Sequence, residues 1–234
     1  MNQLDIIALV GDRTAEWTWV PLAPGLEVMA WPVMVGDLFV GVSARTASAC
    51  AVLLSREGWL CSLTTPQVED WIYEQAALCP EPVLLDPRRI DIASAAAVAK
   101  HSSQLLSRIA LAKRSTLVAC GKSWVLCNGL LSHPGRAANY GLFSPSAPYR
   151  SATGAHALWQ PLSFAHDLDH WDYSQLLRLV RRRPGTPLPS YDSPLRVTEL
   201  VRTVTPPPPS TLAACAGKSC DACEGCDEEK GAGP

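Results

Sequence analysis

The segment 156–175 concentrates the side chains of this chain that could do chemistry. It contains three of the five histidines and three carboxylates: His156, His166, His170, Asp167, Asp169 and Asp172. Imidazoles and carboxylates are costly to bury unless they are paired or bound to a metal, and imidazoles transfer protons near neutral pH. The segment therefore predicts a functional site in the second half of the chain.

Two histidines of this segment are spaced for metal binding. His166 and His170 lie on the same side of the backbone whether the segment is extended or helical. Together with His133, His156 or Asp172 they form a set that suits Zn²⁺ or another first-row metal. The alternative is a solvated loop whose histidines form only local hydrogen bonds.

The same segment also fits catalysis without a metal. Asp172 would orient an imidazole such as that of His166, while Ser174 or Tyr173 would supply a hydroxyl group. A turn that leads into a strand explains Asp172-Tyr173-Ser174 equally well.

Arg136 is a candidate substrate-binding residue. It follows the turn sequence Ser132-His133-Pro134-Gly135, and a guanidinium can clamp a carboxylate or phosphate through two parallel hydrogen bonds. An arginine that ties a loop to backbone carbonyls is the alternative. Gly121-Lys122 lacks the surrounding frame of a phosphate-binding loop, so that motif is excluded there.

The C-terminus carries a second candidate metal site. Its closely spaced cysteines are Cys215, Cys220, Cys223 and Cys226. A tetrathiolate zinc or iron–sulfur site needs such a density of soft ligands. The spacing is too tight for an ordinary zinc ribbon and provides no apolar shell, so a flexible tail with free thiols is the alternative.

The composition limits the class of protein. The 234 residues are 47% hydrophobic, which is enough for one sizeable core. Only 18% are charged and the formal net charge is −2, so we expect no nucleic-acid partner. No apolar run approaches the ~20 residues of a membrane span, and the N-terminus lacks the features of a signal peptide, so we expect no membrane insertion. In a cytoplasmic protein, these cysteines remain free thiols: Cys50, Cys61, Cys79, Cys120 and Cys127.

Local patterns predict helices first and strands later. The expected helices are 47–56 after a Thr46 cap, 67–78 after Thr65-Pro66, and one from Asp91 or Ser94 to 112. The expected strands are 26–31, 37–42, 116–119, 123–126, 139–143, 158–161 and 176–180. This order favours an α+β fold in which N-terminal helices pack on a small, mainly antiparallel sheet formed by the second half.

We expect a single α+β domain over residues 1–205. It divides into a strand-rich opening (1–43), a helical part (44–112) and a strand-rich site region (113–182). The Arg- and Pro-rich segment 181–209 predicts a semi-rigid linker or a surface-wrapping segment. Residues 206–234 then form a proline-hinged, cysteine-rich acidic tail.

Over about half of its length the chain resembles a group of uncharacterised phage and bacterial proteins. The motifs that carry the resemblance are Thr65-Pro66…Trp71, Leu117-Val-Ala…Lys122…Val125-Leu126, Pro134-Gly-Arg136…Tyr140-Gly141, Gln160-Pro161-Leu162…His166 and Asp172-Tyr173-Ser174…Arg178-Leu-Val180. Similar proteins tend to have histidine at the position of Gln175 and another near Gly121, which this chain lacks. The resemblance implies a set of site residues: Lys122, Arg136, His166, Asp172, Tyr173 and Ser174.

These features favour a hydrolase-like enzyme that acts on peptidoglycan-type bonds of the cell envelope. His166 would be the base or a metal ligand, Asp172 would orient it, and Arg136 would anchor a substrate carboxylate in the same pocket. The alternative is a phage structural or assembly protein, in which the polar residues pin loops and the C-terminus binds neighbouring particle subunits. We expect cytoplasmic synthesis in either case, and incorporation into a virion in the second.

Overall fold

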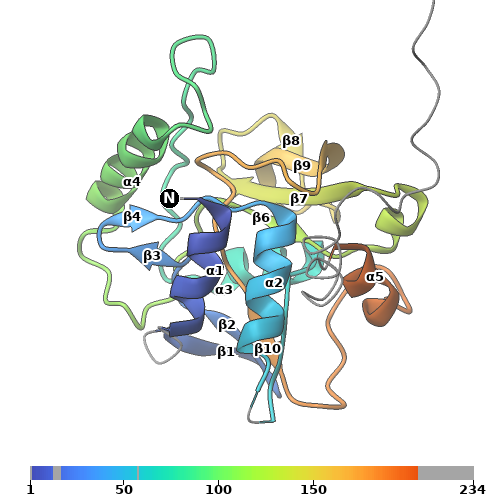
Figure 1. Cartoon of the computed structure of the whole chain (residues 1–234). Coiled ribbons are helices and arrows are strands. Elements are labelled where there is room, and N and C mark those ends of the chain that lie inside the picture. Colours follow the sequence, from blue (N-terminus) through green and yellow to red (C-terminus); the bar gives the residue numbers. More distant parts are fainter. Residues whose placement is uncertain (1, 13–16, 57, 205–234) are drawn as a thin grey trace, which may run out of the picture.

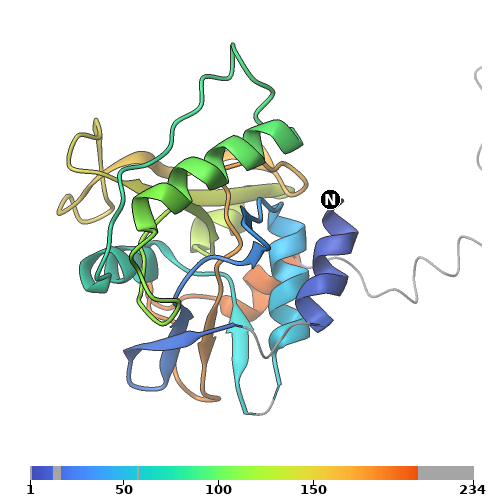
Figure 2. The ribbon, with the colours of Figure 1, turned by 90° about the vertical axis from the view of Figure 1, so that its left-hand side faces the viewer.

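The computed structural model describes residues 2–12, 17–56 and 58–204 and has the predicted α+β architecture. Figures 1 and 2 show the helices around two antiparallel sheets, with α1 beside α2 and α4 against the β3–β4 hairpin. The helices are α1 (Gln3–Asp12), α2 (Ala44–Leu54), α3 (Pro66–Gln75), α4 (Ala95–Ile109) and α5 (Val197–Val204), with the 3-10 helix η2 (Asn128–Ser132). Among the described residues, none of the helices has the length and apolar character needed to cross a membrane.

Hydroxyl side chains cap the N-termini of three helices. Thr65 caps α3 by accepting a hydrogen bond from Val68 N at 3.1 Å, with Pro66 in the first turn as predicted. Ser94 caps α4. The predicted cap of α2 was wrong: Ser43 is the cap, and Thr46 donates its backbone N–H to the Ser43 hydroxyl. The helix therefore begins at Ala44.

Replacing Ser94 by Ala should lower the free energy of unfolding by about 1 kcal/mol, because Ala97 N then loses its 3.2 Å acceptor. Ser107→Ala is the matched control on the same helix, since its exposed hydroxyl bonds only to Gln104 O. The control should change stability by less than about 0.5 kcal/mol. Chemical denaturation of the two variants checks this, and equal losses would contradict the capping role.

Two four-stranded sheets and one hairpin make up the β structure of the described residues. The first sheet has the order β1-β2-β10-β5, from β1 (Trp19–Ala23), β2 (Leu26–Met29), β10 (Val180–Arg182) and β5 (Leu60–Ser62). The second has the order β6-β7-β9-β8, from β6 (Lys122–Val125), β7 (Arg136–Phe143), β9 (Ala157–Asp167) and β8 (Tyr149–Arg150). The hairpin pairs β3 (Met34–Val35) with β4 (Leu38–Phe39).

Of the two alternatives for residues 181–209, a linker that begins at residue 181 was wrong, because Arg181 and Arg182 belong to strand β10. Strand β10 lies between β2 and β5, so the chain returns to the first sheet after completing the second. Further on, α5 buries Leu200 and Val204 and packs against η2. Leu200 and Val204 belong to the core, because burying their apolar side chains removes them from water and stabilises the fold.

The segment 168–179 between β9 and β10 positions the predicted site. Residues 172–180 are all buried, and the segment forms isolated β-bridges from Leu176 to Gly41 and from Gln175 to Lys122. It therefore runs between the segment before α2 and the start of β6. Polar side chains on this segment must find partners inside the protein.

Candidate functional site

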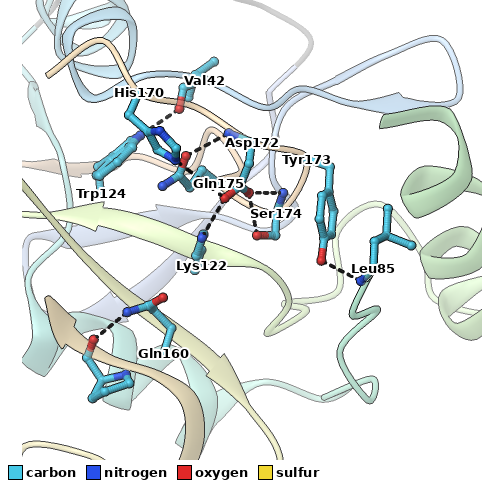
Figure 3. A network of polar contacts seen from close by, with 11 residues as sticks. Val42, Leu85, Lys122, Trp124, Gln160, His170, Asp172, Tyr173, Ser174 and Gln175 are labelled. Atoms are coloured by element: carbon cyan, nitrogen blue, oxygen red, sulfur yellow. Dashed lines mark hydrogen bonds and ion pairs between the residues drawn. The ribbon is translucent and has the colours of Figure 1, made fainter. Parts of the chain in front are cut away.

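A buried ion pair forms the centre of the predicted site. Lys122 Nζ, at the start of β6, lies 2.9 Å from Asp172 Oδ2, and their side chains are 8% and 6% exposed. Ser174 donates to the other carboxylate oxygen, from its backbone N at 2.8 Å and its Oγ at 2.7 Å. Gln175 Oε1 accepts from Asp172 N at 2.9 Å. We call Lys122, Asp172, Ser174 and Gln175 the Asp172 network (Figure 3).

Two opposing effects set the charge state of Asp172. Burial alone would raise the pKa of its carboxyl, but the Lys122 ammonium and the hydrogen bonds from Ser174 outweigh burial, and the pKa lies below its ordinary value. The carboxylate is therefore charged at neutral pH. Its two oxygens already accept from three donors of the protein, so Asp172 holds the turn and Lys122 in place.

The hydroxyl groups of Ser174 and Tyr173 lie in different surroundings. The Ser174 hydroxyl donates to the Asp172 carboxylate, which also binds the Lys122 ammonium, and not to an imidazole. Tyr173 points away from the network and its hydroxyl accepts from Leu85 N at 2.8 Å (Figure 3). Tyr173 thus fastens the connector before α4, and the structure does not bring it together with His166.

His166 and His170 form a stacked imidazole pair beside the network. Their ring centroids are 3.9 Å apart with an interplanar angle of 7°. His170 Nε2 lies 3.9 Å from Asp172 Oδ2 and has no hydrogen-bond partner. Trp124 meets the ring of His166 edge-on at 6.1 Å and donates its indole N–H to Val42 O at 2.7 Å. Both imidazoles are half-buried, so one side of the pair faces solvent.

The surroundings of His166 favour its neutral form. Burial lowers its pKa, and the electrostatic interactions of His166 with His170 and Lys122 act in the same direction, whereas Asp172 opposes them. A neutral, partly exposed imidazole can accept a proton at neutral pH.

Arg136 does not join this cluster. It is exposed, and its Nη1 donates to Ala165 O at 3.2 Å. In the β7–β9 register Arg136 is opposite Asp167, whereas Ala137 is opposite His166. Since successive side chains of a strand point to opposite faces, Arg136 lies on the other face of this strand pair from His166. The expected convergence of Arg136 with His166 and Asp172 was wrong on this point.

The remaining histidines of the proposed metal set have other contacts. His133 stacks on Phe164 with ring centroids 4.3 Å apart, and His156 Nε2 lies 2.8 Å from Glu74 Oε1. Within the described part of the chain, no group of three or more His, Cys, Asp or Glu side chains is arranged to hold a metal ion. Zinc at His166 and His170 therefore gains no support from the geometry.

The other predicted metal ligands, Cys215, Cys220, Cys223 and Cys226, lie outside the described residues. The cysteines of the described residues are free thiols: Cys50, Cys61, Cys79, Cys120 and Cys127.

The sequence interpretation missed two buried titratable residues, Glu69 and His101. Glu69 on α3 and His101 on α4 are 5% and 2% exposed and line one pocket. The spacing of Glu69 and His101 relative to the apolar residues of their helices could have identified both. Glu69 lies three residues before the buried Ile72, and His101 lies midway between the buried Ala97 and Leu105. A titratable group on the apolar stripe of a helix is a candidate functional residue.

Comparison of the chain with protein-family models, with curated proteins and with solved structures gives no match. The resemblance to the phage and bacterial group therefore stays a prediction.

Proposed function

We propose that the protein is a hydrolase-like enzyme in which His166 is the general base. The observation that supports this most is the half-exposed imidazole pair stacked beside the buried Asp172–Lys122 ion pair. The ion pair holds Asp172, which lies 3.9 Å from His170 Nε2, and the ring of His170 stacks on that of His166. A fixed general base is more effective than a mobile one. The lowered pKa of His166 keeps it ready to accept a proton.

In this proposal, water is the nucleophile. His166 takes a proton from a water molecule as its oxygen bonds to the carbonyl carbon of an amide, and returns a proton to the nitrogen as the C–N bond breaks. Ser174 is not the nucleophile because its hydroxyl donates to Asp172, and Lys122 is a positioning residue because its ammonium is committed to Asp172. Arg136 has no part in this step.

Peptidoglycan-type amide bonds of the cell envelope are the substrate class we propose. Neither imidazole lines one of the main cavities of the described chain. A reactive group at the surface suits a polymer that is bound along the protein better than a small molecule that must be enclosed.

Replacing His166 by Asn should reduce amide hydrolysis by at least about 100-fold, which is the low end of what a general base contributes. The assay measures new amino groups released from isolated cell envelopes by the full chain. His133→Asn is the matched control, since His133 is an exposed histidine stacked on Phe164. The control should keep the wild-type rate, and an unchanged rate in His166→Asn would contradict the proposal.

The second candidate is a phage structural or assembly protein without catalytic activity. One observation favours it: the hydrogen-bonding positions of Asp172 are occupied by Lys122 and Ser174, as in a group that only holds the fold together. This candidate predicts the chain in fixed stoichiometry in purified particles, bound to other particle subunits. The enzyme proposal predicts release of amino groups by the isolated chain.

A further inference from the structure

A pocket opens where the start of β1, the β3–β4 hairpin and the loop after α4 meet (Figure 1). Its walls include Trp17, Met29, Trp31 and Met34, and Arg114 lies beside them. The cavity measures about 250 Å³. A cavity of about 150 Å³ is already large enough to hold a benzene ring, so this pocket has room for a small ring compound with one substituent.

Hydrogen bonds tie the segments that form these walls to one another. Ala30 donates its backbone N–H to Thr18 O at 2.9 Å, and Val118 N donates to Ala30 O at 3.0 Å. The indole of Trp31 donates to Lys113 O at 3.2 Å, which fixes the loop after α4. The walls are therefore formed before any ligand binds, as in most small-molecule sites.

The apolar walls of the pocket consist of indole rings and thioethers. Met29 and Met34 are 1% and 8% exposed, whereas Trp17 and Trp31 are half-buried, so the methionines form the deeper wall. Thioethers make favourable contacts with aromatic rings, and aromatic rings pack on one another edge-on or offset. A flat aromatic group suits these walls better than a flexible chain, because a flexible chain also loses conformational freedom on binding.

Arg114 supplies the charge of the pocket. Its guanidinium lies over the ring of Trp31, with Cζ 4.4 Å from the ring centroid, and this stacking leaves the N–H groups at its edge available. Among the described residues, its hydrogen-bond partner is the thioether of Met34, a weak acceptor 2.8 Å from Nη1. Arg114 is the only charged residue among those described as lining the pocket, and it forms no ion pair with a described carboxylate. Because arginine stays charged near neutral pH, the pocket favours an anion.

We propose that this pocket binds a small aromatic carboxylate, with its ring against the indoles and thioethers and its carboxylate bound by the Arg114 guanidinium. A guanidinium and a carboxylate form two parallel, charge-assisted hydrogen bonds. The ring gains from the removal of its apolar surface from water. The pocket shares no residue with the Asp172 network or with the pair of His166 and His170, so the proposal does not depend on the hydrolase activity.

The test measures binding of benzoate, benzamide and acetate to the full chain by NMR titration at constant ionic strength. Benzamide keeps the ring without the charge, and acetate keeps the charge without the ring. Benzoate should bind at least tenfold more tightly than either of the others. Equal binding of benzoate and benzamide would overturn the role of the guanidinium, and equal binding of benzoate and acetate would overturn the role of the apolar walls. Absence of benzoate binding would overturn the site itself.

A variant of the guanidinium tests its role in binding. Arg114→Gln should weaken benzoate binding at least tenfold, the scale of a hydrogen bond to a charged group, and should still fold because Arg114 is exposed. Arg183→Gln is the matched control, since Arg183 is also exposed and also stacks on a tryptophan, with Cζ 4.1 Å from the ring centroid of Trp59. The control should bind benzoate as the wild type does. Unchanged binding by Arg114→Gln, or an equal loss in the control, would overturn the assignment.

The indole N–H resonances of a ¹⁵N-labelled chain locate the bound ring. The resonance of Trp17 is identified as the one that is lost in Trp17→Phe, and that of Trp159 as the one lost in Trp159→Phe. As benzoate is added to the wild type, the Trp17 resonance should shift, because Trp17 lines the pocket. The resonance of Trp159, on β9 and outside the pocket, should stay in place. Benzoate binding without a shift of the Trp17 resonance would place the ligand elsewhere and contradict the proposal.

Discussion

Asp172→Ala should lower the free energy of unfolding by about 3–5 kcal/mol, one of the largest effects expected of a single substitution here. The substitution leaves the Lys122 ammonium, 8% exposed, without its partner at 2.9 Å. It also removes the acceptor of both Ser174 donors. Urea denaturation measures the loss.

The matched control for this substitution is Asp169→Ala. Asp169 pairs with Arg45 at 2.7 Å, but its side chain is 70% exposed, and exposed pairs contribute less than about 1 kcal/mol. Because the folded pKa of Asp172 is depressed, its contribution is present above the unfolded pKa of ~3.9 and is lost as the pH falls through the folded value. Similar losses in the two variants, or no acid sensitivity, would contradict the buried ion pair.

Trp124→Ala should also cost about 3–5 kcal/mol, because it empties a large space in the core and removes the bond to Val42 O. Trp124 is 2% exposed and supports the ring of His166. The loss should therefore appear both in stability and in a shifted ring resonance of His166.

Trp159→Ala is the control for that experiment. Trp159 is on β9, is 36% exposed, and should change stability by less than about 1 kcal/mol. A larger loss for Trp159 than for Trp124 would show that the core is not arranged as described.

Sequence signals within a single turn are sufficient to predict where helix α3 begins. Thr65-Pro66 sets the start of α3 because the cap and the proline act within one turn. For α2 the same reasoning fails by three residues, since Ser43 and Thr46 are both hydroxyl residues and only Ser43 has the extended backbone of a cap. Helix α1 was missed because it buries little, chiefly Ile6 and Val10.

Contacts between residues that are distant in the chain could not be predicted from the sequence. The three residues of β10 become a strand because β2 and β5, distant in the chain, supply partners on both sides. The ion pair of Lys122 with Asp172 likewise joins residues 50 positions apart. Residue types identified Asp172, Lys122 and His166 as candidates, but they could not fix the β7–β9 register that places Arg136 on the other face.

The central claim is that a neutral His166 acts as a base, and the pH profile of amide hydrolysis by the full chain on isolated cell envelopes tests it most directly. The account predicts release of amino groups that rises with pH through the folded pKa of His166, which lies below its ordinary value, and then levels off near neutral pH. Folded protein that releases no amino groups at any pH, or a profile that His166→Asn leaves unchanged, would contradict it.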